Sequence, residues 1–450
     1  MKLIAAVNDS AAESPRYVAR GPAQLRRIAK RYDLSPQLAE TVRLLSLVLP
    51  FRVSQYVLDE LIDWSRVPDD PMYQLVFPQD GMLSPEHVRA LAALAPHGRL
   101  AGPGLAELVR RIRSELNPHP AEQLSSNVPL DARGDPIPGL QHKYDETVLY
   151  FPSHGQTCHS YCSYCFRWAQ FVGDPELRFA TNTPDDLVAY LQRHPRVSDV
   201  LVTGGDPMIM STARLREHVE PLLRVDSLRT IRFGTRALAY WPSRFVGDRD
   251  ADDLLRLLER VVSGGRTAAV MAHVSHPVEL EGDLVRTAIE RIRSTGALLF
   301  TQAPLMRRVN DDAATWREMW TTQLSLGMTP YYLFVARDTG AQDYFKVPLR
   351  RAAQIYRDGL SGMSGLGRTV RGPVMSATPG KVAVDGPAVL NGDRVLSLRL
   401  LQARDPSLVG RPFWAYDNAA AAWVDELVPH PSSDPELVRA VWGGPALTSR

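Results

Sequence analysis

The chain has 450 residues, of which 44% are hydrophobic, as in an ordinary soluble protein with a large core. Its 52 lysines and arginines nearly balance 50 aspartates and glutamates, and the net charge of +2 predicts neither a nucleic-acid nor a membrane partner. The start, MKLIAAVNDS, is too short in apolar residues for a signal peptide, and VRLLSLVLPF has about half the length of a membrane span. We therefore expect a soluble, cytoplasmic protein.

Residues 1–140 are predicted to form an N-terminal helical region that ends in a connector. The segments SPQLAETVRLLSLVL and SPEHVRALAALA each begin with Ser-Pro, a helix-start signal, and continue with apolar residues at helical spacing. The connector, residues 117–140, is rich in proline and has little periodicity.

Between residues 141 and 381, short apolar runs alternate with amphipathic segments. The predicted strands are TVLYFP, DVLVTGG, TIRFGT, AAVMAHV, ALLFTQA and PYYLFVA. The helices predicted between them are PDDLVAYLQRH, ARLREHVEPLLR, DDLLRLLERVV, DLVRTAIERIR and WREMWTTQLSL. This alternation favours an α/β fold with a parallel sheet, closed or partly closed. We predict a partial (β/α)6 TIM-like barrel over residues 141–381 and a small, β-containing C-terminal extension over residues 382–450.

Polar motifs follow the predicted strands at their carboxyl ends, which is where barrel enzymes carry their chemistry. The motifs are SHGQTC, TGGDP, GTR, HVSHP, TQAPL and ARD. This coincidence of strand ends and polar side chains favours an enzyme, independently of any resemblance.

All of the chain's cysteines, Cys158, Cys162 and Cys165, lie in the segment CHSYCSYCFRW after the first predicted strand. The spacing suits an iron–sulfur cluster in which each thiolate binds a separate iron. Three ligands would leave one iron of a [4Fe-4S] cluster open to another molecule. A zinc site completed by His154 or His159 is the alternative, but zinc sites usually combine two ligand pairs and this chain has no second pair. The lack of cysteines elsewhere fits a reducing cytoplasm.

The cysteine spacing, with an aromatic residue before the third cysteine, resembles the radical S-adenosylmethionine (radical SAM) superfamily. Further segments resemble its lysine 2,3-aminomutase family, in the family's order: TGGDPM, IRFGTR, HVSHPVEL, QAPLMRRVND, PYYLFVARD, YFKVP and TPGKV. The segments FRVSQYVLDELIDWSRVPDDPMYQLVFP and IPGLQHKYDETVL also resemble the family, so the resemblance covers approximately residues 25–390. After the third cysteine, CFRWAQFVG differs from the family's Cys-Thr-Arg-Arg-Arg-Phe-Ala-Gly.

The resemblance implies that S-adenosylmethionine binds the open iron and is cleaved by one electron to methionine and a 5′-deoxyadenosyl radical. Tyr164 occupies the aromatic position near the adenine. Gly204, Gly205 and Asp206 in GGDP are implied to contact the methionine amino group, because glycines let a backbone approach a ligand closely, although the motif alone would predict an ordinary turn. Gln302, at another strand end, is implied to contact the same cofactor.

Lys381 in SATPGKVAV matches the family's lysine that forms an imine with pyridoxal 5′-phosphate. Such a lysine must be neutral to react, and burial favours the neutral form. By resemblance, His273 and His276 lie around the pyridoxal ring. The sequence departs from the family at two points. The family's four glycines before this lysine are reduced to one, and an arginine near the phosphate is replaced by Thr147, with Lys143 as a substitute.

Arg167 matches the arginine that binds the substrate carboxylate, for which a guanidinium is well shaped. Two family aspartates that hold the distal ammonium of lysine correspond here to Arg337 and Ala377. A cation near an ammonium opposes binding, so lysine is not the expected substrate. An acidic side chain is the simplest partner for Arg337, while neutralisation of Arg337 by the adjacent Asp338 would suit a neutral substrate.

The sequence thus predicts a radical SAM, pyridoxal phosphate-dependent 2,3-aminomutase that converts a small-molecule α-amino acid into a β-amino acid. The expected partners are an electron donor of the flavodoxin or ferredoxin type and a second copy of the chain in a homo-oligomer. The alternatives are different chemistry on the same scaffold (epimerisation, elimination or lysine modification) and a non-enzymatic iron–sulfur protein. Some family members carry a C-terminal zinc site that uses cysteine; no cysteine follows Cys165, so we expect none here.

Overall fold

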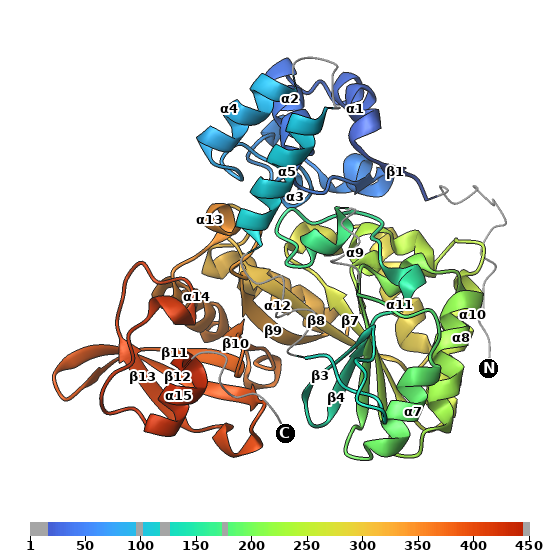
Figure 1. Cartoon of the computed structure of the whole chain (residues 1–450). Helices are drawn as coiled ribbons and strands as arrows, with labels where there is room; N and C mark the ends of the chain where they lie inside the picture. Colours follow the sequence, from blue (N-terminus) through green and yellow to red (C-terminus); the bar gives the residue numbers. More distant parts are fainter. Residues whose placement is uncertain (1–16, 96–101, 118–126, 173–178, 444–450) are drawn as a thin grey trace.

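A computed structural model describes residues 17–95, 102–117, 127–172 and 179–443. Figure 1 shows a helical N-terminal region above one end of a large sheet, with a smaller β-rich region beside it. Each of the three regions has its own cluster of buried apolar side chains.

The large sheet is mixed, in the order β13-β12-β11-β10-β9-β8-β7-β6-β5-β4-β3. Strands β4 to β10 run parallel, and the pairs at either side of them are antiparallel. The strands from the predicted barrel are β3 (Leu140–Tyr144), β4 (Thr147–Tyr150), β5 (Asp199–Val202), β6 (Thr230–Thr235), β7 (Thr267–His273), β8 (Leu298–Leu305) and β9 (Thr329–Val335). The six predicted strands are therefore confirmed as β4 to β9.

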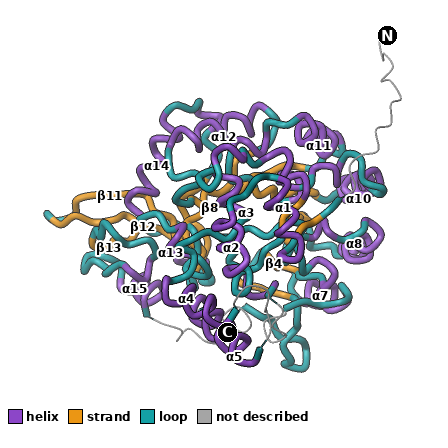
Figure 2. The backbone as a smooth tube through the Cα atoms, turned by 90° about the horizontal axis from the view of Figure 1, so that it is seen from above, coloured by secondary structure: helices purple, strands orange, loops and turns teal. Residues whose placement is uncertain are grey.

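The predicted helices between these strands are also confirmed. They are α7 (Asp185–Arg193), α8 (Thr212–Val219), α10 (Ala251–Ser263), α11 (Asp283–Ser294) and α12 (Ala313–Ser325), followed by α14 (Leu349–Ser361). Figure 2 shows them in an arc outside the strands. Their apolar faces and the strands enclose the largest buried cluster, as expected for helices that cover a parallel sheet.

The sheet is not closed by hydrogen-bonded strands, because β3 and β13 stand at its two ends. Its parallel part is nevertheless strongly curled. Lys143 on β3 donates a hydrogen bond to the carbonyl of Ala377, which lies between β10 and β11 at the other side of the order. The Lys381 ammonium on β11 lies 5.6 Å from the centre of the Tyr144 ring on β3. Eight strand intervals of about 4.8 Å would separate β3 from β11 in a flat sheet, so these contacts require curvature.

The N-terminal region contains α1 (Leu25–Arg31), α2 (Pro36–Leu45), α3 (Pro71–Val76), α4 (Pro85–Leu94) and α5 (Pro103–Leu116). The two Ser-Pro starts are confirmed: Ser35 and Ser84 cap α2 and α4, and each side chain accepts a backbone N–H three residues later. The region's core includes Tyr240, Met306 and Phe345, which follow strand ends, so the region covers the carboxyl ends of the parallel strands. Residues 118–126 of the predicted connector lie outside the described residues.

The C-terminal extension continues the large sheet. Strand β10 (Arg371–Ser376) pairs with β9, and β11 (Gly380–Leu390), β12 (Asp393–Ala403) and β13 (Pro412–Tyr416) follow as antiparallel neighbours. Helix α15 (Pro435–Trp442) packs on them. The predicted β-containing tail is thereby placed, at the β10 side of the sheet. In the described part of the chain, no helix combines the length and hydrophobicity needed to cross a bilayer.

Candidate active site

The cysteine loop joins β4 to α7 at the carboxyl end of the sheet, and the N-terminal region holds it by its backbone. The Tyr161 N–H donates to the Arg52 carbonyl at 2.8 Å, and the Ser163 N–H donates to the Leu75 carbonyl at 2.8 Å. The Ser163 hydroxyl also lies 2.7 Å from the Gln74 carbonyl. A loop without regular structure is therefore fixed by residues about ninety positions earlier in the sequence.

The three thiols lie together in this loop. Burial raises the pKa of each, and it raises the pKa of Cys165 to about 12. The charges of the neighbouring cysteines contribute to the raised pKa values of Cys158 and Cys165. Only a bound cation would stabilise three thiolates here.

Among the described residues, no three histidine, cysteine or acidic side chains converge on a point suited to a single metal ion. An iron–sulfur cluster does not require such convergence, because each thiolate binds a different iron. His159, proposed as a zinc ligand, is fully buried, and its Nδ1 lies 3.6 Å from an Asp206 oxygen. The donor set therefore fits a cluster better than a zinc ion.

The GGDP turn after β5 packs directly on the cysteine loop. Gly204 has φ +134°, and a Cβ there would lie 2.1 Å from Gln156 Nε2. A Cβ on Gly205 would lie 2.3 Å from the Thr157 carbonyl oxygen. Both positions therefore require glycine for close backbone packing, and a role in binding the cofactor remains a prediction.

Asp206 is 1% exposed, and protein groups occupy its carboxylate. It accepts hydrogen bonds from the Met208 N–H at 3.0 Å, the Thr235 hydroxyl at 2.7 Å and the Arg236 N–H at 2.8 Å. Asp206 thereby fixes the ends of β5 and β6 relative to each other. The predicted contact of its side chain with the methionine amino group remains a prediction.

Tyr164, in the cysteine loop, contacts His273 at the end of β7. The Tyr164 hydroxyl lies 2.9 Å from His273 Nε2 and also accepts a hydrogen bond from Arg236. Burial raises the pKa of Tyr164 and holds the pKa of His273 well below its usual value, so both side chains are neutral. Because Arg236 can only donate, the Tyr164 hydroxyl accepts from it and shares its own proton with His273 Nε2 at 2.9 Å or with the Ser275 hydroxyl at 3.3 Å.

Gln302 and His276 are the other predicted cofactor-site residues at these strand ends. Gln302 on β8 is in register with His273 on β7, so the two predicted cofactor contacts are neighbours. His276 caps the short helix Pro277–Leu280, where its Nδ1 accepts the Val278 N–H at 3.4 Å. Burial lowers the pKa of His276 to about 4.

Lys381 is held on a regular strand, in register with Ser376 on β10 and Gln402 on β12. Its ammonium donates to Gln402 Oε1 at 2.6 Å and lies 4.5 Å from the centre of the Tyr332 ring. Burial, together with the charges of Arg232 and Arg371, lowers the pKa of Lys381 to about 7. The lysine is thus half neutral near neutral pH, which is what reaction with an aldehyde requires.

Thr147, which replaces the family's arginine near the phosphate, lies on β4, and Lys143, the expected substitute, lies on β3. Thr147 begins β4 and is buried, whereas Lys143 on β3 reaches the Ala377 carbonyl beside the lysine loop. The role of Lys143 as a substitute cation remains a prediction. Arg232 and Arg371 bring positive charge near Lys381, while Asp199, which is paired with Arg232, brings one negative charge.

Arg167 and Arg337 share one aromatic side chain. The Arg167 guanidinium lies 5.0 Å and that of Arg337 5.4 Å from the centre of the Phe166 ring. Arg167 also stacks on Phe151 at 4.5 Å. Burial, together with the charge of Arg337, lowers the pKa of Arg167 to about 10. Two guanidinium groups in one partly buried place favour a ligand with negative charge, although Asp338 lies 4.0 Å from Arg337 Nε.

Known proteins with similar sequences carry aminomutase names. A protein of Aquifex aeolicus named "Putative L-lysine 2,3-aminomutase" is 31% identical over 291 residues, which is 64% of this chain and 74% of that protein. The chain belongs to the lysine 2,3-aminomutase family of radical SAM proteins. L-lysine 2,3-aminomutase of Clostridium subterminale is 24% identical over 303 residues (62% of this chain, 70% of that protein), and that of Acetoanaerobium sticklandii is 27% identical over 235 residues (52% and 53%). No protein-family model matches the chain.

Membership of the lysine 2,3-aminomutase family assigns the chain to the radical SAM isomerases. Several residues that shape the site were not singled out in the sequence: Arg52, Tyr144, Arg236, Glu279, Tyr332 and Gln402. Arg236 and Glu279 lie within the quoted motifs GTR and HVSHPVEL, so the signal for them was present. Gln402 carries no sequence signal, because strand pairing alone brings it to Lys381.

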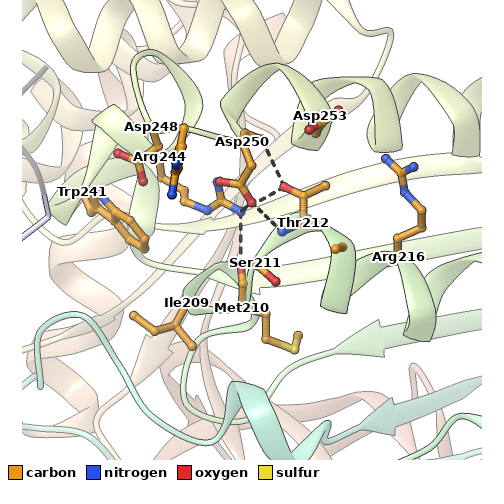
Figure 3. Close-up of a pocket in the computed structure, with 12 residues that line it drawn as sticks. Ile209, Met210, Ser211, Thr212, Arg216, Trp241, Arg244, Asp248, Asp250 and Asp253 are labelled. Carbon is orange, nitrogen blue, oxygen red and sulfur yellow. Dashed lines mark hydrogen bonds and ion pairs between the residues drawn. The ribbon is translucent and has the colours of Figure 1, made fainter. Parts of the chain in front are cut away.

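A cavity of about 590 Å³ lies apart from this site (Figure 3). It is lined by Trp241, Arg216 and the pair of Arg244 with Asp250, whose Nη1 and Oδ1 atoms are 2.7 Å apart. None of the residues predicted to bind a cofactor or substrate lines it.

Proposed function

We propose that the protein is a pyridoxal phosphate-dependent 2,3-aminomutase that uses a [4Fe-4S] cluster and S-adenosylmethionine. Its substrate would be an α-amino acid with an acidic or neutral side chain rather than lysine. The observation that carries the proposal is the place of Lys381, a half-buried lysine whose ammonium lies against the rings of Tyr144 and Tyr332 inside a curled sheet and whose pKa is lowered to about 7. The curl of this open sheet supports the partial barrel that we propose for the radical SAM fold.

The residues present fit the cofactors. Cys158, Cys162 and Cys165 would hold the cluster, which with S-adenosylmethionine supplies a hydrogen-abstracting radical when reduced. Lys381 would hold pyridoxal phosphate, which supplies a π-system through which nitrogen can migrate. Lys143 and the arginines near Lys381 would balance the phosphate charge.

The residues of the chain would position the reacting groups and shield them from water. The rings of Tyr332 and Tyr144 lie against the Lys381 ammonium, so the end of this side chain would react in an apolar space with little water. Gln402 accepts a hydrogen bond from the protonated amine and orients it. The N-terminal region covers the carboxyl ends of the strands, where it would exclude water and oxygen.

The proposed substrate class follows from charge. Arg167 would bind the α-carboxylate, and Arg337 would bind a carboxylate or other polar group of the side chain. Two arginines that share Phe166 are more stable with an anion between them than without one. Lysine would bring a third cation to this place, at a cost of roughly tenfold or more in binding.

The test is anaerobic reconstitution with iron, sulfide and pyridoxal phosphate, followed by incubation with S-adenosylmethionine, reductant and single amino acids. Mass spectrometry after derivatisation separates α- from β-amino acids. We expect a β-isomer from an acidic or neutral amino acid. Clean conversion of lysine alone would contradict the substrate assignment, and S-adenosylmethionine cleavage without any isomer would favour different chemistry on this scaffold.

A further inference from the structure

Two arginines from different regions of the molecule reach the cysteine loop on opposite sides. Arg52, from the N-terminal region, donates through Nη1 to the Thr157 hydroxyl at 2.9 Å and to the Cys158 carbonyl at 3.1 Å. Its guanidinium also lies 5.6 Å from the centre of the Tyr161 ring. The positive charge is thus held against the first cysteine of the loop by three separate contacts.

Arg236, at the end of β6, approaches the loop from within the sheet. It is 6% exposed, and its Nη1 donates to the Tyr164 hydroxyl between the second and third cysteines and to the Ser275 hydroxyl at 3.1 Å. Its Nη2 donates to the Tyr240 hydroxyl at 2.7 Å. The charge cannot move away, because the surrounding groups fix both ends of the guanidinium.

Glu279 faces Arg236 from the opposite side. Its Oε2 accepts from Arg236 Nη2 at 3.1 Å, and its Oε1 accepts the N–H groups of Ser275 at 2.8 Å and His276 at 2.9 Å. The carboxylate is fully buried. A fixed cation and a fixed anion therefore lie at different depths behind the cysteine loop, in a place where charges are poorly screened.

We propose that Arg52 and Arg236 are positioning residues that set the reduction potential of the cluster, and that Glu279 opposes Arg236. Three thiolates give an oxidised [4Fe-4S] cluster a net charge of −1, and reduction adds one more negative charge. Fixed cations stabilise the more negative state, so they ease reduction by the electron donor.

This inference rests on the proposed function, because it requires the cluster. The experiment is an anaerobic redox titration of reconstituted full-length protein, followed by the electron paramagnetic resonance signal of the reduced cluster. The variants are Arg52→Gln, which keeps hydrogen-bond donors but loses the charge, Arg52→Lys, which keeps the charge, and Glu279→Gln, which removes the buried anion. Arg256→Gln, at an exposed position of α10, is the matched control.

We expect Arg52→Gln to lower the potential, so that the ratio of reduced to oxidised cluster at the wild-type midpoint falls roughly tenfold. Arg52→Lys and Arg256→Gln should stay within about twofold of wild type, and Glu279→Gln should shift the ratio in the opposite direction. Equal midpoints for wild type, Arg52→Gln and Glu279→Gln would overturn the inference. If Arg52→Gln assembles no cluster, the sign of the Glu279→Gln shift decides alone. A wild-type protein without iron and sulfide would instead contradict the proposed function.

Discussion

The cysteine loop and the Lys381 site are built in opposite ways. The loop has no regular structure and is held by hydrogen bonds from the N-terminal region, and burial disfavours its thiolates. Lys381 lies on a strand paired on both sides, and burial already shifts it toward the neutral form that it needs. The lysine end is therefore prepared before any cofactor binds, whereas the thiolates of the cysteine end would become stable only with the proposed cluster. This difference predicts different responses to substitution.

The largest effect is expected at the cysteine end. Cys162→Ser should abolish cluster assembly, because two thiolates cannot hold the cluster in a buried loop. Iron and sulfide content and the visible absorption of the reconstituted protein measure this. Pyridoxal phosphate binding should persist in the same variant. Loss of both cofactors together would contradict the independence of the two ends.

At the lysine end, Lys381→Ala should reduce turnover by about a thousandfold while the cluster assembles normally. The visible absorption of bound pyridoxal phosphate, and a borohydride-trapped adduct found only in the wild type, check the assignment. A borohydride adduct in Lys381→Ala would show that another residue binds the cofactor.

The pKa of Lys381 sharpens the comparison further. The neutral amine reacts with the aldehyde, and a pKa of about 7 means that the neutral fraction rises with pH through this value. The initial rate of covalent pyridoxal phosphate binding should increase about tenfold from pH 6 to pH 8 and level off above. A rate that still rises steeply above pH 9 would indicate an ordinary, solvated lysine.

A smaller effect is expected at Arg337, beside Phe166 and Arg167. Arg337→Asp should lower kcat/KM for an acidic amino acid by roughly tenfold or more and improve it for lysine, because the substitution reverses the local charge. Amino-acid competition assays measure the change. Arg357→Asp, at an exposed position of α14, is the control for a general effect of charge. An unchanged preference would place the side chain of the substrate elsewhere.

The smallest expected effect tests the anchoring of the cysteine loop. Ser163→Ala removes a hydroxyl that bonds to the carbonyls of Gln74 and Leu75, so it should lower the free energy of unfolding by about 1 kcal/mol. Ser361→Ala, which removes an exposed hydroxyl from the end of α14, should have little effect. Thermal unfolding of the cluster-free protein compares the two variants, and equal stabilities would show that Ser163 does not anchor the loop.

The sequence predicted the regular parts of the molecule well and the long-range contacts poorly. The six strands and the helices between them were predicted because local periodicity and strand-end motifs mark them. The contact of Arg52 with the cysteine loop was not predictable, because it joins the Arg52 guanidinium to the Thr157 hydroxyl and the Cys158 carbonyl, about a hundred positions later. The same applies to Gln402, and to the extension of the sheet by β11 to β13, since strand pairing is not written in local composition.

The side-chain roles divide in a similar way. Cys158, Cys162, Cys165 and Lys381 were assigned from motifs, and their surroundings fit the assignment. The cofactor contact assigned to Asp206 from its motif remains a prediction. The motif did not indicate the structural role of this carboxylate, which accepts hydrogen bonds from Thr235 and from backbone N–H groups and so holds two strand ends together.

Metal and sulfide analysis of the protein purified without oxygen tests the account most directly. About four iron and four sulfide ions per chain are expected, with a spectrum of the reduced state that changes when S-adenosylmethionine is added. One zinc ion per chain, with neither iron nor sulfide, would contradict it.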